Sequence, residues 1–126
     1  MTYLCPSFFP TKLTGCTRAL GMENKEILDS QISASSKLDE DNAATLARLH
    51  LKEHGSKQGG WSALNNDFNQ WLQVDLGSLT RVTRVATQGK SGSDQWVSRY
   101  RLQYSHDGVT FNFTKMTANK IGRAHV

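Results

Sequence analysis

Cysteine, proline and long apolar runs are all scarce in this sequence. No run approaches the roughly 20 apolar residues that a membrane-spanning helix needs. The chain of 126 residues has two prolines and two cysteines, and the cysteines, Cys5 and Cys16, show neither a C-x-x-C motif nor the spacing of a metal site. They can form a disulfide across a short loop or remain two unrelated thiols, so the composition leaves the redox compartment open.

The residue patterns of common catalytic sites are also missing. His50 and His54 are four residues apart, but the glutamate of the zinc-protease pattern H-E-x-x-H is not in its place. Neither these histidines nor His106 have a nearby cysteine or aspartate pattern that suggests a catalytic triad or a metal site. We therefore predict that the protein is not an enzyme.

Length and charge indicate one mildly basic domain. A chain of 126 residues is long enough for one domain. The formal net charge of +4 comes from positive residues that are scattered rather than clustered, so charge alone does not indicate a nucleic-acid ligand. Residues 1–15 lack the basic start and the continuous apolar core of a signal peptide, and we interpret them as a leader or linker.

What the sequence does contain is a series of short alternating segments after residue 60. Leu72, Val74 and Leu76 alternate with polar or amphipathic residues, which is the period of a half-buried β-strand. Further strands are predicted over residues 81–87, 96–105 and 109–113, and Asp107-Gly108 between the last two is typical of a hairpin turn. Several short strands joined by turns favour an antiparallel sandwich or barrel.

The first half of the chain is harder to interpret. Residues 27–34 weakly favour a strand. Local propensity over residues 39–54 favours a helix, because acidic residues precede an apolar run that Gly55 ends. Residues 121–126 match the translation of a common sequencing-adapter oligonucleotide, and we interpret them as a non-native tail.

The order of motifs from Cys16 onward resembles the discoidin family, also called the F5/8 type C domain. The resemblance covers residues 16–120, and no single motif carries it alone. The motifs are Cys16 with Leu20-Gly21-Met22-Glu23, Gln31-Ile32-Ser33-Ala34-Ser35-Ser36, Ala47-Arg48-Leu49, Gly60-Trp61-Ser62-Ala63, Gln70-Trp71-Leu72-Gln73-Val74-Asp75-Leu76-Gly77, Val85-Ala86-Thr87-Gln88-Gly89, Trp96-Val97-Ser98-Arg99-Tyr100, and Tyr104-Ser105-His106-Asp107-Gly108-Val109-Thr110-Phe111.

The resemblance implies an all-β fold, namely an eight-stranded jelly-roll β-sandwich of the galactose-binding-domain-like class, usually extracellular. Family members are closed by a disulfide between their first and last cysteines. Cys16 matches the first, and its partner is absent from this chain. We therefore expect residues 16–120 to be a partial domain that is incomplete at its C-terminus. The resemblance also replaces the helix at 39–54 with a loop, or spike, at about 36–45 and a strand that begins near Ala47-Arg48-Leu49.

In this family ligands bind to the spike loops, so we place the candidate site there. Ligand-binding candidates on the two spikes are Lys37, Leu38, Asp39, Asp41, Asn42, Lys90, Ser91, Asp94, Gln95 and Trp96. The second spike, residues 90–95 with Trp96 next, combines small polar residues, single charges and an aromatic, which is typical of sugar recognition. Trp96 is equally compatible with a core-facing strand position, and Trp61 and Trp71 are interpreted as packing residues.

Other readings of these loops stay open. Asp39 and Asp41, with Asn42, offer oxygen ligands to Ca²⁺, but a solvated acidic loop is the preferred interpretation, and we commit to no cofactor. Arg48, Arg99 and Arg101 either line the ligand cleft or pair with acids, for which Asp75 is one partner. Asn112-Phe113-Thr114 is an N-glycosylation sequon on a predicted strand.

Together these features predict an extracellular or cell-surface adhesion module. It would bind a cell-surface or matrix glycan or protein through its spike loops. The alternative is a peripheral module that binds anionic phospholipid, which ranks lower because the first spike has no aromatic residue and carries three acids that repel such a surface.

Overall fold

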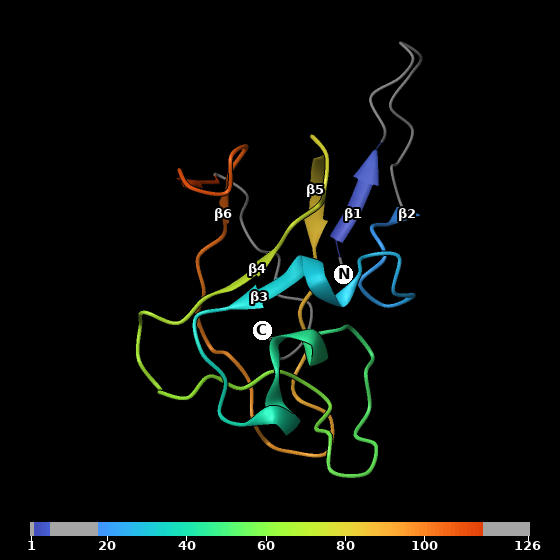
Figure 1. Cartoon of the computed structure of the whole chain (residues 1–126), viewed down its shortest axis with the longest axis vertical. Coiled ribbons are helices and arrows are strands. Elements are labelled where there is room, and N and C mark those ends of the chain that lie inside the picture. Colours follow the sequence, from blue (N-terminus) through green and yellow to red (C-terminus); the bar gives the residue numbers. More distant parts are fainter. Residues whose placement is uncertain (1, 6–17, 115–126) are drawn as a thin grey trace.

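The structure, a computed structural model, describes residues 2–5 and 18–114. Short strands dominate, and the helical segments are single 3-10 turns (Figure 1). The strands are β1 (Thr2–Cys5), β2 (Arg18–Ala19), β3 (Ile32–Ala34), β4 (Leu72–Val74), β5 (Arg81–Val85), β6 (Gln103–Tyr104) and β7 (Asn112–Phe113). The 3-10 turns are η1 (Asp29–Gln31), η2 (Glu40–Asn42) and η3 (Ala44–Leu46).

The strands of the described ranges form three small antiparallel sheets. One has the order β2-β1-β5, the second pairs β3 with β4, and the third pairs β6 with β7. Residues 2–5, which we assigned to a leader or linker, form the middle strand of the first sheet. The predictions for Cys16 and for residues 121–126 lie outside the described residues.

A small aliphatic core is formed by residues of the β3–β4 pair, of β5 and of the segment that follows β2. Leu20, Met22, Ile27 and Ile32 are buried. Three side chains that the alternating pattern predicted to face inward pack against this core: Leu72, Val74 and Leu76. The β3–β4 register, with Ile32 opposite Val74, brings the two segments together. Removal of this apolar surface from water stabilises the fold by about 25 cal/mol per Å².

The segment from 36 to 54 follows the family expectation in one respect and departs from it in another. The helix favoured by local propensity is reduced to η2 and η3, as the resemblance implied. The prediction of a strand that begins near residues 47–49 is wrong. Arg48 turns its guanidinium inward, where Nη1 donates to the Met22 carbonyl at 2.8 Å. His50 then adopts a positive φ of 58°, which ends any extended conformation.

The predicted strand at 96–105 is much shorter than expected, because only Gln103 and Tyr104 pair with β7. The hairpin signal between β6 and β7 is confirmed. Gly108 has a φ of 72°. The Asp107 carboxylate accepts hydrogen bonds from the Thr110 amide (2.8 Å) and Val109 amide (2.9 Å). These amides, together with the Ser105 hydroxyl, hold the pKa of Asp107 well below its usual range.

Candidate functional site

Three loops meet at one end of the molecule, the lower end in Figure 1. They are residues 36–46, 51–60 and 88–96, and we name them the first, second and third loops. Backbone hydrogen bonds join the first loop to the second and to the segment that follows it, and side-chain hydrogen bonds join the third loop to both. The Leu38 amide donates to the Ser62 carbonyl (2.8 Å), the Ser62 amide to the Asn42 carbonyl (3.2 Å), and the Gln58 amide to the Asp41 carbonyl (2.9 Å). The loops therefore form one hydrogen-bonded unit.

Lys90 lies at the centre of this unit rather than at its surface. Its Nζ donates to Asn42 Oδ1 at 2.6 Å, to Ser62 Oγ at 3.2 Å and to Gln95 Oε1 at 3.4 Å. Asn42 and Lys90 are both buried. Two residues predicted to contact ligand are thus occupied by contacts between the loops.

The second and third loops are also joined tightly. Ser91 Oγ donates to Glu53 Oε2 at 2.7 Å, and this hydrogen bond is the largest cause that lowers the pKa of Glu53. Gly59 pairs with Ser91 in a β-bridge. A Cβ on Gly59 would lie 2.5 Å from the Ser91 Cβ, so this backbone approach is open only to glycine.

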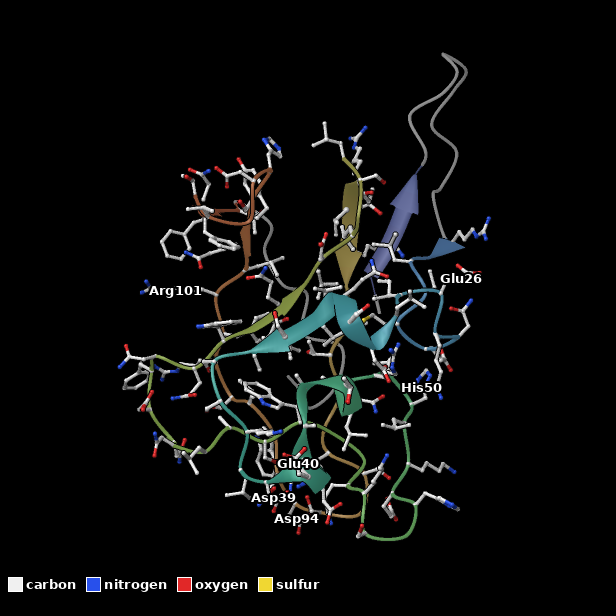
Figure 2. The ribbon with its side chains drawn as sticks, in the orientation of Figure 1. Glu26, Asp39, Glu40, His50, Asp94 and Arg101 are labelled. Carbon is white, nitrogen blue, oxygen red and sulfur yellow. The ribbon has the colours of Figure 1, made fainter. Side chains whose placement is uncertain are left out.

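The remaining predicted residues lie on the outside of the loops. Figure 2 places Asp39, Glu40 and Asp94 at the lower end of the molecule. Leu38 and Trp96 are about half exposed, at 52% and 48%. The exposed residues of the predicted set are Lys37, Leu38, Asp39, Asp94, Gln95 and Trp96. Among these, Gln95 also belongs to the Lys90 network and so links it to the surface.

A shallow depression adjoins the first loop. It has a volume of about 230 Å³ and is lined by Ala34, Ser36, Lys37 and Ala44. Lys37 Nζ lies 2.5 Å from Glu40 Oε1, an exposed ion pair at the rim.

The acidic residues proposed for Ca²⁺ are engaged with side-chain donors. Asp39 Oδ1 accepts from Asn42 Nδ2 (2.6 Å), and Asp41 Oδ1 accepts from Ser56 Oγ (2.9 Å). Over residues 2–5 and 18–114, no three histidine, cysteine or acidic side chains gather as metal ligands. His50, Glu53 and His54 have the spacing H-x-x-E-H of another zinc-protease pattern, but here they lie in turns and loop rather than on a helix.

The tryptophans and arginines divide between packing and surface. Trp61 is buried, as predicted, and its Nε1 donates to the Ser36 carbonyl at 2.8 Å. Trp71 is 49% exposed, so its interpretation as a packing residue holds only in part. Arg48 pairs with Asp29 and not with Asp75. Arg101 lies over the Phe113 ring, 5.5 Å from its centroid.

Sequence reasoning identified residues 52–60 as a loop but did not place this second loop at the candidate site. Glu53 and Gly59 contact the third loop, and Ser56 and Gln58 contact the first. The paired glycines at 59 and 60 were the one sequence signal for this contact, because a glycine can mark a site where another backbone approaches closely. Nothing in the local sequence says which backbone approaches.

A family model of the F5/8 type C domain matches residues 31–125. The chain is 39% identical over 103 residues to lactadherin of Rattus norvegicus, a match that covers 78% of this chain and 24% of that protein. It is 42% identical over 102 residues to EGF-like repeat and discoidin I-like domain-containing protein 3 of Mus musculus, covering 77% of this chain and 21% of that protein. It is also 37% identical over 114 residues to discoidin, CUB and LCCL domain-containing protein 2 of Rattus norvegicus, a match that covers 84% of this chain and 14% of that protein.

The chain therefore belongs to the F5/8 type C, or discoidin, family. The fold of this family is a β-sandwich, and the predicted all-β class is confirmed. The chain spans about a quarter or less of the length of these relatives. The matching family and these relatives indicate no enzyme family. In the part of the chain that the structure describes, no helix has the length and apolarity of a membrane span.

Proposed function

We propose that this chain is an extracellular recognition module that binds a cell-surface or matrix glycan or protein with the three joined loops. The observation that carries the proposal is that these loops form one hydrogen-bonded unit with Leu38, Asp39, Asp94 and Trp96 exposed on it. Loops held by a rigid β scaffold are where discoidin-like sandwiches can vary their ligand without changing their core. An exposed aromatic beside polar groups suits a sugar ring or a peptide.

The charge of the loop surface separates the possible ligands. Asp39, Glu40 and Asp94 gather at the lower end (Figure 2), whereas Lys90 is buried and Lys37 is paired with Glu40. The exposed charge of the first and third loops is thus mainly negative, whereas the second loop carries the exposed lysines Lys52 and Lys57. An acidic surface favours a neutral glycan or a basic protein segment and repels anionic lipid.

Arrays of glycans and matrix proteins, probed with the full chain, test this proposal. We expect Asp94→Asn to weaken binding at least tenfold, because it removes an exposed charge without touching the Lys90 network. A matched control is Leu79→Ser, in the turn between β4 and β5 at the other end of the molecule (Figure 1), where the side chain is 81% exposed. Equal binding by the Asp94 variant and the unaltered chain contradicts the site assignment.

A second candidate function, peripheral binding to anionic phospholipid, is favoured by two exposed apolar side chains. Leu38 and Trp96 are about half exposed on the same joined loops, and apolar groups at loop tips can enter the boundary of a bilayer. Sedimentation with phosphatidylcholine vesicles, with and without phosphatidylserine, separates the two functions. Binding that requires phosphatidylserine and is lost in Leu38→Ser supports the membrane role, and no sedimentation with either vesicle contradicts it.

A further inference from the structure

Lys90 is an unusual member of the loop unit because it is a buried cation. Only 8% of the residue is exposed. Burying an ammonium group is costly unless its hydrogens are bonded. Three oxygens receive hydrogen bonds from Nζ, and all three belong to neutral side chains, those of Asn42, Ser62 and Gln95. The amine therefore joins the first loop, the residue that follows Trp61, and its own loop.

Asn42 continues the connection to the surface. Its residue exposure is 4%. The amide oxygen accepts from Lys90 Nζ at 2.6 Å, while the amide nitrogen donates to Asp39 Oδ1 at 2.6 Å. A cation on one side and a carboxylate on the other fix the orientation of this amide, since only Oδ1 accepts and only Nδ2 donates. A continuous path thus runs from the buried amine to an exposed carboxylate.

We propose that Lys90 is a positioning residue, which acts through Asn42 to hold Asp39 and the first loop in a fixed relation to the third loop. A lysine suits this role because its long stem reaches between the loops and its ammonium group has three donors. The backbone bonds between Leu38, Asn42 and Ser62 lie beside this connection, because Lys90 Nζ contacts both Asn42 and Ser62. The loop surface is preorganised before any ligand arrives, which lowers the entropic cost of binding.

The role of this surface in recognition rests on the proposed function, but the connection itself can be measured without a ligand. In the full chain, Lys90→Met keeps a side chain of similar length and removes all three donors. We expect amide hydrogen exchange at Leu38 and Ser62 to become at least tenfold faster. Exchange at Ser35 and Asp75, whose amides donate to Trp71 and Gln31 in and beside the β3–β4 pair, changes less than twofold.

The matched control is Lys57→Met, an exposed lysine in the second loop. We expect this variant to leave the exchange rates of all four amides unchanged, because the amine of Lys57 is not buried between the loops. Unchanged exchange in Lys90→Met overturns the proposal. So does an equal acceleration at all four amides, because that result is the signature of general destabilisation rather than of loop positioning.

A second variant tests the path through Asn42. Asn42→Leu removes the central amide, and we expect it to accelerate exchange at Leu38 and Ser62 as Lys90→Met does. Residues that act through one contact have non-additive effects, so the double variant should exchange no faster than the faster single variant. Additive acceleration shows that the two residues act independently and overturns the proposal.

The unaltered chain gives an independent measurement in case Lys90→Met does not fold. A buried, bonded ammonium group exchanges its hydrogens slowly enough to be seen by nitrogen-15 NMR, and we expect such a signal from Lys90 but not from exposed Lys52. Lys90 hydrogens that exchange as fast as those of Lys52 overturn the proposal. If the arrays and vesicles yield no ligand, the proposed function fails, while these exchange measurements still decide the role of Lys90.

Discussion

Arg48 and Asp29 form an ion pair in which one partner is buried and the other is exposed. The Arg48 side chain is 4% exposed and that of Asp29 is 68% exposed. Arg48 Nη2 contacts Asp29 Oδ1, and Nη1 donates to the Met22 carbonyl. The pair fastens the start of the 47–50 segment to η1 and to the segment before it. This asymmetry determines which substitution is the more costly.

Removal of Asp29 should destabilise the fold more than removal of Arg48. Asp29→Ala leaves a buried guanidinium without its carboxylate, at a cost of about 2–3 kcal/mol in the free energy of unfolding. Arg48→Met removes the charge and keeps much of the packing. We expect the free energy of unfolding to fall by about 1 kcal/mol, mainly because the Met22 carbonyl loses its hydrogen-bond donor. Urea denaturation of both variants measures the difference. A larger loss in Arg48→Met shows that packing of the arginine stem outweighs its charge.

Gly59→Ala should separate the second and third loops. Its Cβ would lie 2.5 Å from the Ser91 Cβ and 3.0 Å from the Leu51 carbonyl oxygen. We expect a destabilisation of about 1–3 kcal/mol from this overpacking, measured by urea denaturation. Ser91→Gly in the same chain removes the closer contact and should restore part of the loss. No recovery in the double variant contradicts the assignment of the strain to Ser91.

The Glu53 carboxyl should titrate below its ordinary range in the folded chain. The Ser91 hydroxyl is the largest cause, followed by the amide of Glu53 itself, and Lys52 adds a smaller contribution. Because the folded pKa is the lower one, this contribution to stability is present above the unfolded pKa of Glu53. It is lost as the pH falls through the folded pKa.

NMR titration of the Glu53 side chain measures this shift directly. Ser91→Ala removes the main hydrogen-bond donor, so the pKa of Glu53 should rise toward that of an unperturbed glutamate. Lys57→Met, in the same loop, is the control and should leave the pKa unchanged. An unchanged pKa in Ser91→Ala shows that this hydrogen bond does not persist in solution.

Asn112 should carry an N-linked glycan when the chain passes through a secretory pathway. Asn112 is exposed on β7 and begins the sequon with Phe113 and Thr114. Expression in secretory cells, followed by glycosidase treatment, should give a shift in mass that disappears in Asn112→Gln. Thr114→Ser preserves the sequon and should keep the shift. A single unshifted mass for the secreted chain contradicts the prediction.

Alternation and turn chemistry were readable from the sequence because they are local. Leu72, Val74 and Leu76 pack on the core as their period of two predicts, and Asp107-Gly108 forms its hairpin turn because aspartate accepts nearby amides and glycine tolerates a positive φ. The order of motifs was sufficient to identify the family. The residues that bind ligand remain a prediction, since loop sequences do not show which side chains face outward.

Tertiary contacts decided the rest. Lys90 looked like a surface cation and is buried, because its partners Asn42 and Ser62 are 48 and 28 residues away. Arg48 belongs to an expected strand and instead turns inward to Asp29, 19 residues earlier. The sequence by itself determined the pattern of strands and turns, which depends on neighbours within a few positions. Only the tertiary structure decided which polar side chains join the loops and which stay exposed on them, because burial depends on residues that are distant along the chain.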